Sequence, residues 1–175
     1  MNYFEIFEMP LSLHIDRNEL SKKYFELQRK YHPDFFSKAG ESEQAEMLEI
    51  SSMINRGYKI FTNADETIKY VLQLKGLLEE NEKYELPRDF LMKMMELNEM
   101  LMDPDILIVE ETETKISQLE NQLYHSVQNI IENFIEDRTT DEQLLVVKDY
   151  YFKKKYLKRI LERLEGMRNI ASQNN

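Results

Sequence analysis

A regular hydrophobic seam between residues 106 and 136 constrains the fold of this chain more than any other feature. Its members are Ile116, Leu119, Leu123, Val127, Ile130 and Phe134. They follow one another in steps of three and four residues, which places all six on one face of an α-helix. The spacing therefore predicts a long amphipathic helix over about 106–136, and such a helix needs partners to cover its apolar face.

Two neighbouring segments can supply these partners. Pro87 suits the first turn of a helix that runs to about Met102, where the sequence DPD interrupts it. Thr140 and Gln143 have the spacing of a capping box, which predicts a last helix beyond them. Its expected inward residues are Leu144, Val147, Tyr151, Leu157, Ile160, Leu164 and Met167. Three consecutive helices joined by short turns predict an up-down-up bundle.

The N-terminal half predicts shorter helices. Asp16, with Glu19 three residues later, opens a helix that ends within a residue or two of the His-Pro-Asp sequence at 32–34. A second helix is expected from Glu41 to about Phe61, and a third within DETIKYVLQLKG, which stops at Gly76. The residues of the second helix expected to face inward are Ala45, Leu48, Ser52, Asn55, Ile54, Tyr58 and Phe61.

Few residues interrupt these patterns, because the chain has only four Gly and four Pro in 175 residues. We therefore expect an all-α protein. The acidic, apolar-poor stretch at 79–85 separates the two halves. It predicts a first domain over 1–76, a linker over 77–86 and a three-helix domain over 87–175.

Charge and composition exclude several classes of function. The formal net charge of -10 repels a polyphosphate backbone, so we expect no nucleic-acid partner. The absence of cysteine excludes disulfides and thiolate chemistry, and the three scattered histidines suggest neither a metal site nor a cofactor. No apolar run approaches the roughly 20 residues of a membrane span, and the acidic, aromatic start does not resemble a targeting peptide. We therefore expect a cytoplasmic protein without a membrane partner.

One basic stretch runs against the acidic average. Lys153 to Lys155, extended by Lys158 and Arg159, could be a patch for nucleic acid. Glu162 and Glu165 follow on the same helix, and a mixed pattern of this kind is typical of a solvated helix face.

The tripeptide His32-Pro33-Asp34 allows three interpretations. In the first, Pro33 only stops a helix, and His32 and Asp34 are solvated residues of a loop. In the second, His32 is a general base oriented by Asp34, but no nucleophile or oxyanion donor lies in an interpretable pattern nearby, so no catalytic residue is predicted. In the third, a proline-stiffened bend presents an imidazole and a carboxylate to a partner with little ordering entropy to lose.

The surroundings of the tripeptide favour the third interpretation. An aromatic first segment, a basic helix ending in YHPD and a following helix ending in INRGYKIF resemble the J-domain of DnaJ-type co-chaperones. Gly57 stands where alanine is commoner in that family. The resemblance implies that the tripeptide and the basic helix bind a DnaK-like ATPase and stimulate its hydrolysis. The implied contact residues are His32, Pro33, Asp34, Lys22, Lys23, Arg29 and Lys30.

The whole chain resembles a narrower family. YFEIFEMP, LQRKYHPDFF, ETIKYVLQLKG and FLMKMMELNEML are similar to the HscB co-chaperones of iron-sulfur cluster biogenesis, which have no Gly/Phe-rich linker and no cysteine-rich region. This resemblance implies two partners. An HscA-type, DnaK-like ATPase would bind the first domain, and an IscU-type cluster scaffold would bind the helical bundle.

The first bundle helix has two faces. Phe90, Met94, Leu97 and Leu101 form the stripe expected to face the other helices. The resemblance implies that the adjoining face contacts the scaffold, together with an aromatic residue of the last helix, Phe152 or Tyr151. The predicted scaffold-binding residues are Leu91, Met92, Met95, Glu96, Glu99 and Phe152. The alternative is that Met92 and Met95 complete the core or an interface with the first domain.

Two departures from the family pattern matter. Phe35 follows the tripeptide where a basic residue is common, so one electrostatic contact to the ATPase is missing. The zinc-binding pair of C-x-x-C motifs found in some members is absent, so no structural zinc is expected. Two other functions stay open: an adaptor for a different client, and a structural helical protein or small hydrolase in which the tripeptide is coincidental.

Overall fold

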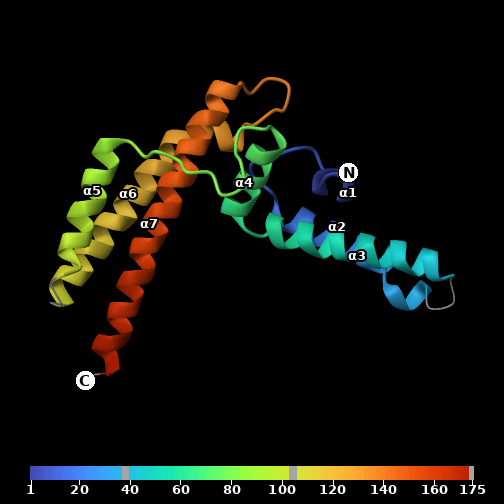
Figure 1. Cartoon of the computed structure of the whole chain (residues 1–175), viewed down its shortest axis with the longest axis horizontal. Helices are drawn as coiled ribbons and strands as arrows, with labels where there is room; N and C mark the ends of the chain where they lie inside the picture. Colours follow the sequence, from blue (N-terminus) through green and yellow to red (C-terminus); the bar gives the residue numbers. More distant parts are fainter. Residues whose placement is uncertain (37–39, 103–105, 174–175) are drawn as a thin grey trace. The chain divides into compact units, whose positions relative to one another are not determined.

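The computed structural model describes residues 1–36, 40–102 and 106–173, and these parts of the chain contain helices and no strand (Figure 1). The helices are α1 (Tyr3–Ile6), α2 (Arg17–Lys30), the 3-10 helix η1 (Pro33–Phe36), α3 (Glu41–Phe61), α4 (Ala64–Leu74), α5 (Arg88–Met100), α6 (Ile106–Glu132) and α7 (Asp141–Gln173). The all-α prediction is confirmed.

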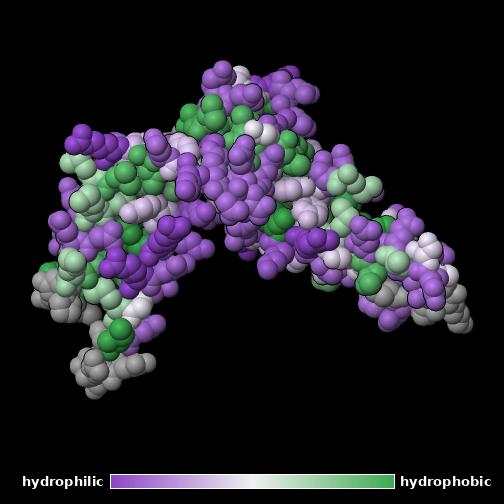
Figure 2. All heavy atoms as spheres, viewed as in Figure 1, coloured by the Kyte–Doolittle hydropathy of each residue, from purple (hydrophilic) through white to green (hydrophobic). Residues whose placement is uncertain are grey.

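The chain forms two compact units. Residues 1–76 and 131–139 make up the first unit, and residues 77–130 and 140–175 make up the second. The segment 131–139, which begins with the last two residues of α6, belongs to the first unit, where the Glu136 carboxylate lies 3.0 Å from the Lys75 ammonium. On the face drawn in Figure 2, hydrophilic residues predominate, and the hydrophobic residues that reach the surface lie in small groups among them.

The helix ends of the first unit follow from local hydrogen bonds. The Asp16 side chain accepts from the backbone N–H of Glu19, which confirms the predicted start of α2. Asn63 caps α4 in the same way, and Gly76 follows α4 with a φ of 68°, a conformation that glycine adopts without steric cost. The predicted bounds of α3 are confirmed at both ends.

The predicted inward face of α3 is partly wrong. Ala45, Leu48, Ser52 and Asn55 are exposed, whereas the buried residues are Ser51, Ile54, Gly57 and Phe61. The reason is a close approach of the N-terminal segment, because a Cβ at position 57 would lie 2.9 Å from the Phe7 ring and 3.2 Å from Tyr3 Cβ. The buried stripe therefore includes a glycine. Because glycine has no side chain, the spacing of hydrophobic residues does not mark position 57 as buried.

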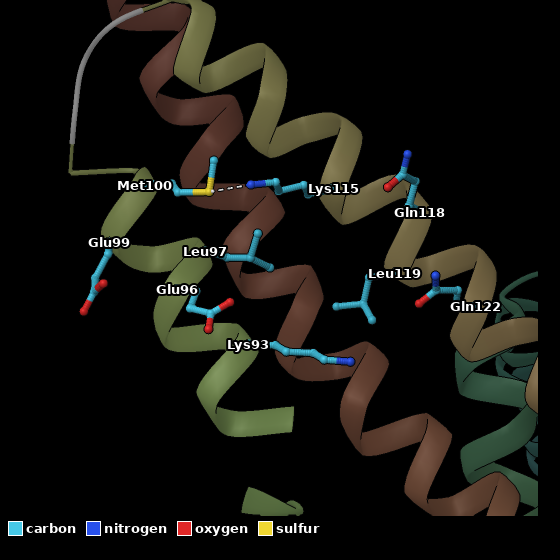
Figure 3. A pocket seen from close by; sticks show the side chains of 9 residues that line it. All are labelled: Lys93, Glu96, Leu97, Glu99, Met100, Lys115, Gln118, Leu119 and Gln122. Carbon is cyan, nitrogen blue, oxygen red and sulfur yellow. Dashed lines mark hydrogen bonds between the residues drawn. The ribbon is translucent and has the colours of Figure 1, made fainter. Parts of the chain in front are cut away.

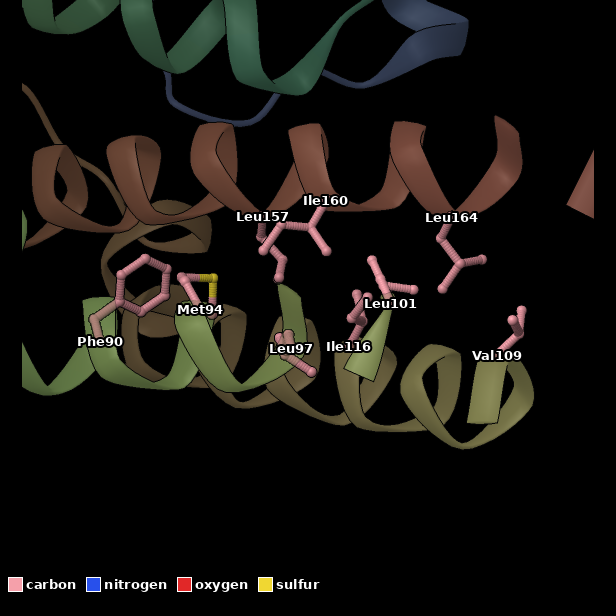
Figure 4. Packing of buried hydrophobic residues seen from close by; sticks show 9 residues of the cluster. All are labelled: Phe90, Met94, Leu97, Leu101, Val109, Ile116, Leu157, Ile160 and Leu164. Carbon is pink, nitrogen blue, oxygen red and sulfur yellow. The ribbon is translucent and has the colours of Figure 1, made fainter. Parts of the chain in front are cut away.

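The second unit contains the three-helix bundle of α5, α6 and α7. Its core consists of Phe90, Met94, Leu97, Leu101, Val109, Ile116, Leu157, Ile160 and Leu164 (Figure 4). Thr140 and Gln143 exchange both hydrogen bonds of the predicted capping box at the start of α7. The seam of α6 is confirmed at Ile116 and Val127, but the helix ends at Glu132, so Phe134 lies beyond it, and Ile131 is buried instead of Ile130. The interrupting DPD at 103–105 lies outside the described residues.

Candidate functional site

The bend at 32–34 is built by the end of α2 and the start of η1. The last turn of α2 closes with the Tyr31 N–H donating to the Leu27 carbonyl at 2.9 Å. Proline cannot continue the helical hydrogen-bond ladder, and it disfavours the α conformation at His32. The chain turns into η1, where the Phe35 N–H donates to the His32 carbonyl at 3.1 Å. The structure describes the backbone of Pro33 within η1, whereas its side chain lies outside the described residues.

Both polar side chains of the bend are accessible. The side chains of His32 and Asp34 are 49% and 88% exposed, with His32 Nδ1 3.6 Å from Asp34 Oδ2. The Asp34 N–H donates to the same ring nitrogen at 3.3 Å. Phe35 is 72% exposed, and its ring lies edge-on to the imidazole with centroids 6.1 Å apart. The bend therefore presents an imidazole, a carboxylate and an aromatic ring to solvent.

The basic residues of α2 are not equivalent. Lys22, Arg29 and Lys30 are exposed, and the Lys30 ammonium lies 5.1 Å from the centroid of the Tyr31 ring. Lys23 is half-buried, and its ammonium donates to the Glu8 carbonyl at 3.0 Å. Lys23 is therefore engaged within the first unit, while the other three cations are exposed along α2, the helix that leads into the bend.

Asn55 holds the α2–α3 hairpin together, a role that sequence reasoning missed. Its side-chain oxygen accepts from the Tyr24 hydroxyl at 3.0 Å and from the Gln28 amide at 2.9 Å. The Tyr24 ring also stacks on Tyr58, with centroids 4.0 Å apart. These contacts join the two helices and thereby orient the bend between them. The sequence signals for Asn55 were its place in the INRGYKIF stretch and a position expected to face inward.

The predicted scaffold face of α5 is exposed. Met92 and Met95 are 55% and 63% exposed, Leu91 is 36% exposed, and Glu96 and Glu99 are exposed. The bundle core is filled from the other side of the same helix by the predicted stripe of Phe90, Met94, Leu97 and Leu101. The alternative in which the two methionines complete the core is therefore wrong.

A groove of about 480 Å³ lies between α5 and α6 (Figure 3). Glu96 and Glu99 line it from α5, and Lys115 and Gln122 line it from α6. The Lys115 ammonium lies 2.9 Å from the Glu111 carboxylate and 3.7 Å from Met100 Sδ. The two carboxylates predicted to contact the scaffold thus border a depression that is lined by both polar and apolar side chains.

Phe152 lies in a different environment from the α5 face. It is half-buried, and its ring stacks nearly parallel on Tyr84, with centroids 4.4 Å apart. The Tyr84 hydroxyl donates to Asp149 Oδ1 at 2.9 Å. Tyr151, the alternative aromatic residue of α7, is buried. Sequence reasoning missed Tyr84 as a candidate residue of the binding surface around Phe152, because Tyr84 lies in the acidic stretch that is predicted to be a linker.

Ionic contacts fix the segment around Tyr84 on α7. Glu82 Oε1 lies 2.5 Å from the Lys148 ammonium, and this hydrogen bond lowers the pKa of Glu82. The other carboxylate oxygen, Oε2, accepts from the Glu79 N–H at 3.1 Å and closes a turn. Burial, together with the hydrogen bond to Asp149, raises the pKa of Tyr84 to about 12. At neutral pH the tyrosine is therefore protonated and the glutamate ionised.

In the described ranges, no group of three or more His, Cys, Asp or Glu side chains is arranged to hold a metal ion. Among the helices of the same ranges, none combines the length and apolar character that a membrane crossing requires.

These observations describe a class of protein: in the described residues it is helical, with an exposed polar bend in one unit and an exposed methionine face in the other. Residues 86–165 match the family described as the HSCB C-terminal oligomerisation domain. The chain is 38% identical to the HscB homologue of Colwellia psychrerythraea over 104 residues. The aligned region covers 59% of this chain and 59% of the relative. It is 31% identical to that of Psychromonas ingrahamii over 150 residues, which is 85% of this chain and 86% of the relative.

A solved structure agrees with these relatives. The chaperone HscB from Vibrio cholerae matches 97% of this chain and 98% of its own, with a TM-score of 0.74 and 25% identity. The chain belongs to the HscB family of co-chaperones.

Proposed function

We propose that this protein is a cytoplasmic adaptor that delivers an IscU-type iron-sulfur scaffold to an HscA-type, DnaK-like ATPase and accelerates ATP hydrolysis there. The protein itself catalyses no reaction. Residues 1–76 form the ATPase-binding domain, and residues 87–175 form the scaffold-binding domain. This division gives each partner a separate surface.

The observation that carries the proposal is the accessible bend in a member of the HscB family. His32 and Asp34 are exposed at the end of α2, and Lys22, Arg29 and Lys30 are exposed along that helix. The cations can steer an acidic partner surface towards the bend, while the imidazole and carboxylate make contacts of fixed geometry. Contacts that are stronger in the hydrolysing conformation of the ATPase shift its population towards that conformation.

The α5 face supports the second half of the proposal. Exposed Met92 and Met95 can adapt to an apolar partner surface, and Glu96 and Glu99 can pair with basic residues at its edge. Binding the scaffold to the same chain that docks on the ATPase raises the local concentration of the scaffold at that ATPase.

The test is single-turnover ATP hydrolysis by the HscA-type ATPase, measured with and without the scaffold. We expect the wild-type protein to stimulate hydrolysis, with a further increase when the scaffold is added. His32→Gln should return the rate to the basal value, because the imidazole contact is lost while the exposed site tolerates the change. His14→Gln is the matched control, because His14 is also an exposed histidine of the first unit.

Full stimulation by His32→Gln would reject the assignment of the bend. Stimulation of the ATPase without any binding of the scaffold would instead support an adaptor for a different client. If no DnaK-like ATPase responds to the protein, the result would support the alternative of a structural helical protein.

A further inference from the structure

We propose that a cationic pocket between the segment 82–86 and α7 binds an acidic segment of the scaffold. This inference rests on the proposed function and extends its scaffold-binding surface beyond α5. The pocket has a volume of about 380 Å³ and lies within the second unit. Its lining residues are Glu82, Lys83, Tyr84, Leu86, Phe152, Lys155, Tyr156 and Arg159.

The aromatic residues of the pocket are held in place. Tyr84 stacks on Phe152, and the hydrogen bond from Tyr84 to Asp149 fixes the hydroxyl end of the ring. The Lys148 ammonium lies 5.7 Å from the centroid of the Tyr84 ring while it pairs with Glu82. A ligand that packs against these half-buried rings therefore meets a preformed surface and has little ordering cost to offset.

The cations of the pocket are uncompensated. Lys83, Lys155 and Arg159 are exposed, and within the described parts of the chain none of them has an ion-pair partner. Two lysines of the same stretch of α7 differ, because Lys148 pairs with Glu82 and Lys153 pairs with Asp149. In a protein of net charge -10, this local excess of positive charge is available to an anionic partner.

A peptide carboxylate fits this pocket better than a polyphosphate. The ionised Glu82 lines the same pocket, so a ligand with closely spaced negative charges meets repulsion as well as attraction. Half-buried Tyr84, Phe152 and Leu86 offer apolar contact to a neighbouring side chain, which an acidic peptide supplies and a phosphate chain lacks. The net charge of the protein also opposes nucleic acid.

Phe152 connects the pocket with the scaffold. It is the α7 residue predicted to contact the scaffold, and it lines the pocket beside Tyr84. A scaffold that reaches Phe152 therefore also reaches Lys155 and Arg159. Charge complementarity then requires an acidic segment at that point of the scaffold surface.

The test compares two neighbouring cations of α7. Arg159 lines the pocket, whereas Lys158 is also exposed but is not among the lining residues. Arg159→Glu and Lys158→Glu change the net charge of the protein by the same amount. Titration of the IscU-type scaffold should show affinity weakened by about tenfold for Arg159→Glu and by about threefold or less for Lys158→Glu. Raising the salt concentration from about 0.05 M to about 0.3 M should reduce the difference between the variants.

Each other result has a separate meaning. Equal affinities for the two variants, with wild-type binding intact, would overturn the pocket proposal and leave the proposed function standing. Failure of the wild-type protein to bind the scaffold would overturn both. A control titration uses fluorescein-labelled single-stranded DNA of about 20 nucleotides. If the wild type binds this DNA and Arg159→Glu abolishes that binding, the pocket is a nucleic-acid site and the proposal is overturned.

Discussion

The two units separate their candidate sites from their cores in different ways. In the first unit, His32 and Asp34 lie on a bend between helices, whereas the buried residues are mainly aromatic and aliphatic side chains of α1, α3 and α4. In the second unit, one helix serves both purposes, because exposed Met92 lies between buried Phe90 and Met94. Substitutions in the bend should therefore leave the core intact, whereas on α5 neighbouring positions belong in turn to the core and to the proposed scaffold face.

The largest expected effect tests the division of α5 and α7 into core and surface. Leu157→Ala removes a fully buried side chain from the bundle core, so we expect the free energy of unfolding to fall by about 2–5 kcal/mol. Met92→Ala combined with Met95→Ala should change it by less than about 1 kcal/mol, because both side chains are exposed. Urea unfolding followed by circular dichroism measures both values.

Scaffold titration completes this comparison. The double methionine variant should bind the scaffold more weakly while it stimulates the ATPase normally in the absence of scaffold. An unchanged binding isotherm would remove the α5 face from the scaffold site.

Two helical glycines, one in each unit, differ in how closely the surrounding atoms pack against them. A Cβ at Gly57 would lie 2.9 Å from the buried Phe7 ring, whereas a Cβ at Gly166 would meet nothing within 4 Å. Gly→Ala within a helix contributes about 1 kcal/mol of stability, and overpacking costs about 1–3 kcal/mol. We therefore expect Gly166→Ala to raise the melting temperature and Gly57→Ala to leave it unchanged or lower it. If the melting temperature rises by the same amount in both variants, the N-terminal segment with Tyr3 and Phe7 moves to accommodate the added methyl group without loss of stability.

The smallest expected effect concerns the contact of Glu82 with Lys148. The hydrogen bond lowers the pKa of Glu82, so the folded state binds its proton more weakly than the unfolded state. The stabilisation is therefore present above the ordinary pKa of 4.5 and is lost as the pH falls through the lowered value. It should amount to about 1 kcal/mol or less, because the pair is partly exposed to solvent.

Thermal melting of the wild type and Glu82→Gln across the acid range checks this contribution. The difference in melting temperature should be largest near neutral pH and vanish in acid. A difference that persists in acid would mean that packing, and not charge, accounts for the effect of the substitution.

Much of the fold was predictable because it depends on local patterns. The capping residues Asp16 and Thr140, the bounds of α3 and the buried stripe of α5 follow from the spacing of residue types, and each is confirmed. The inward face of α3 was not predictable, because burial there depends on contact with distant Tyr3 and Phe7. The position of Phe152 against Tyr84 was likewise hidden, because a stretch rich in charge carries no periodic signal.

The sequence by itself determined that this protein is helical, where most helices begin and end, and that a proline bend follows a basic helix. These features depend on backbone hydrogen bonding and on side chains a few residues apart. Only the tertiary structure decided which side of α3 is buried, that Lys23 is held by Glu8, and that Lys155 and Arg159 share a pocket with Tyr84. Such contacts join residues far apart in the chain, and they form only when packing brings whole elements together.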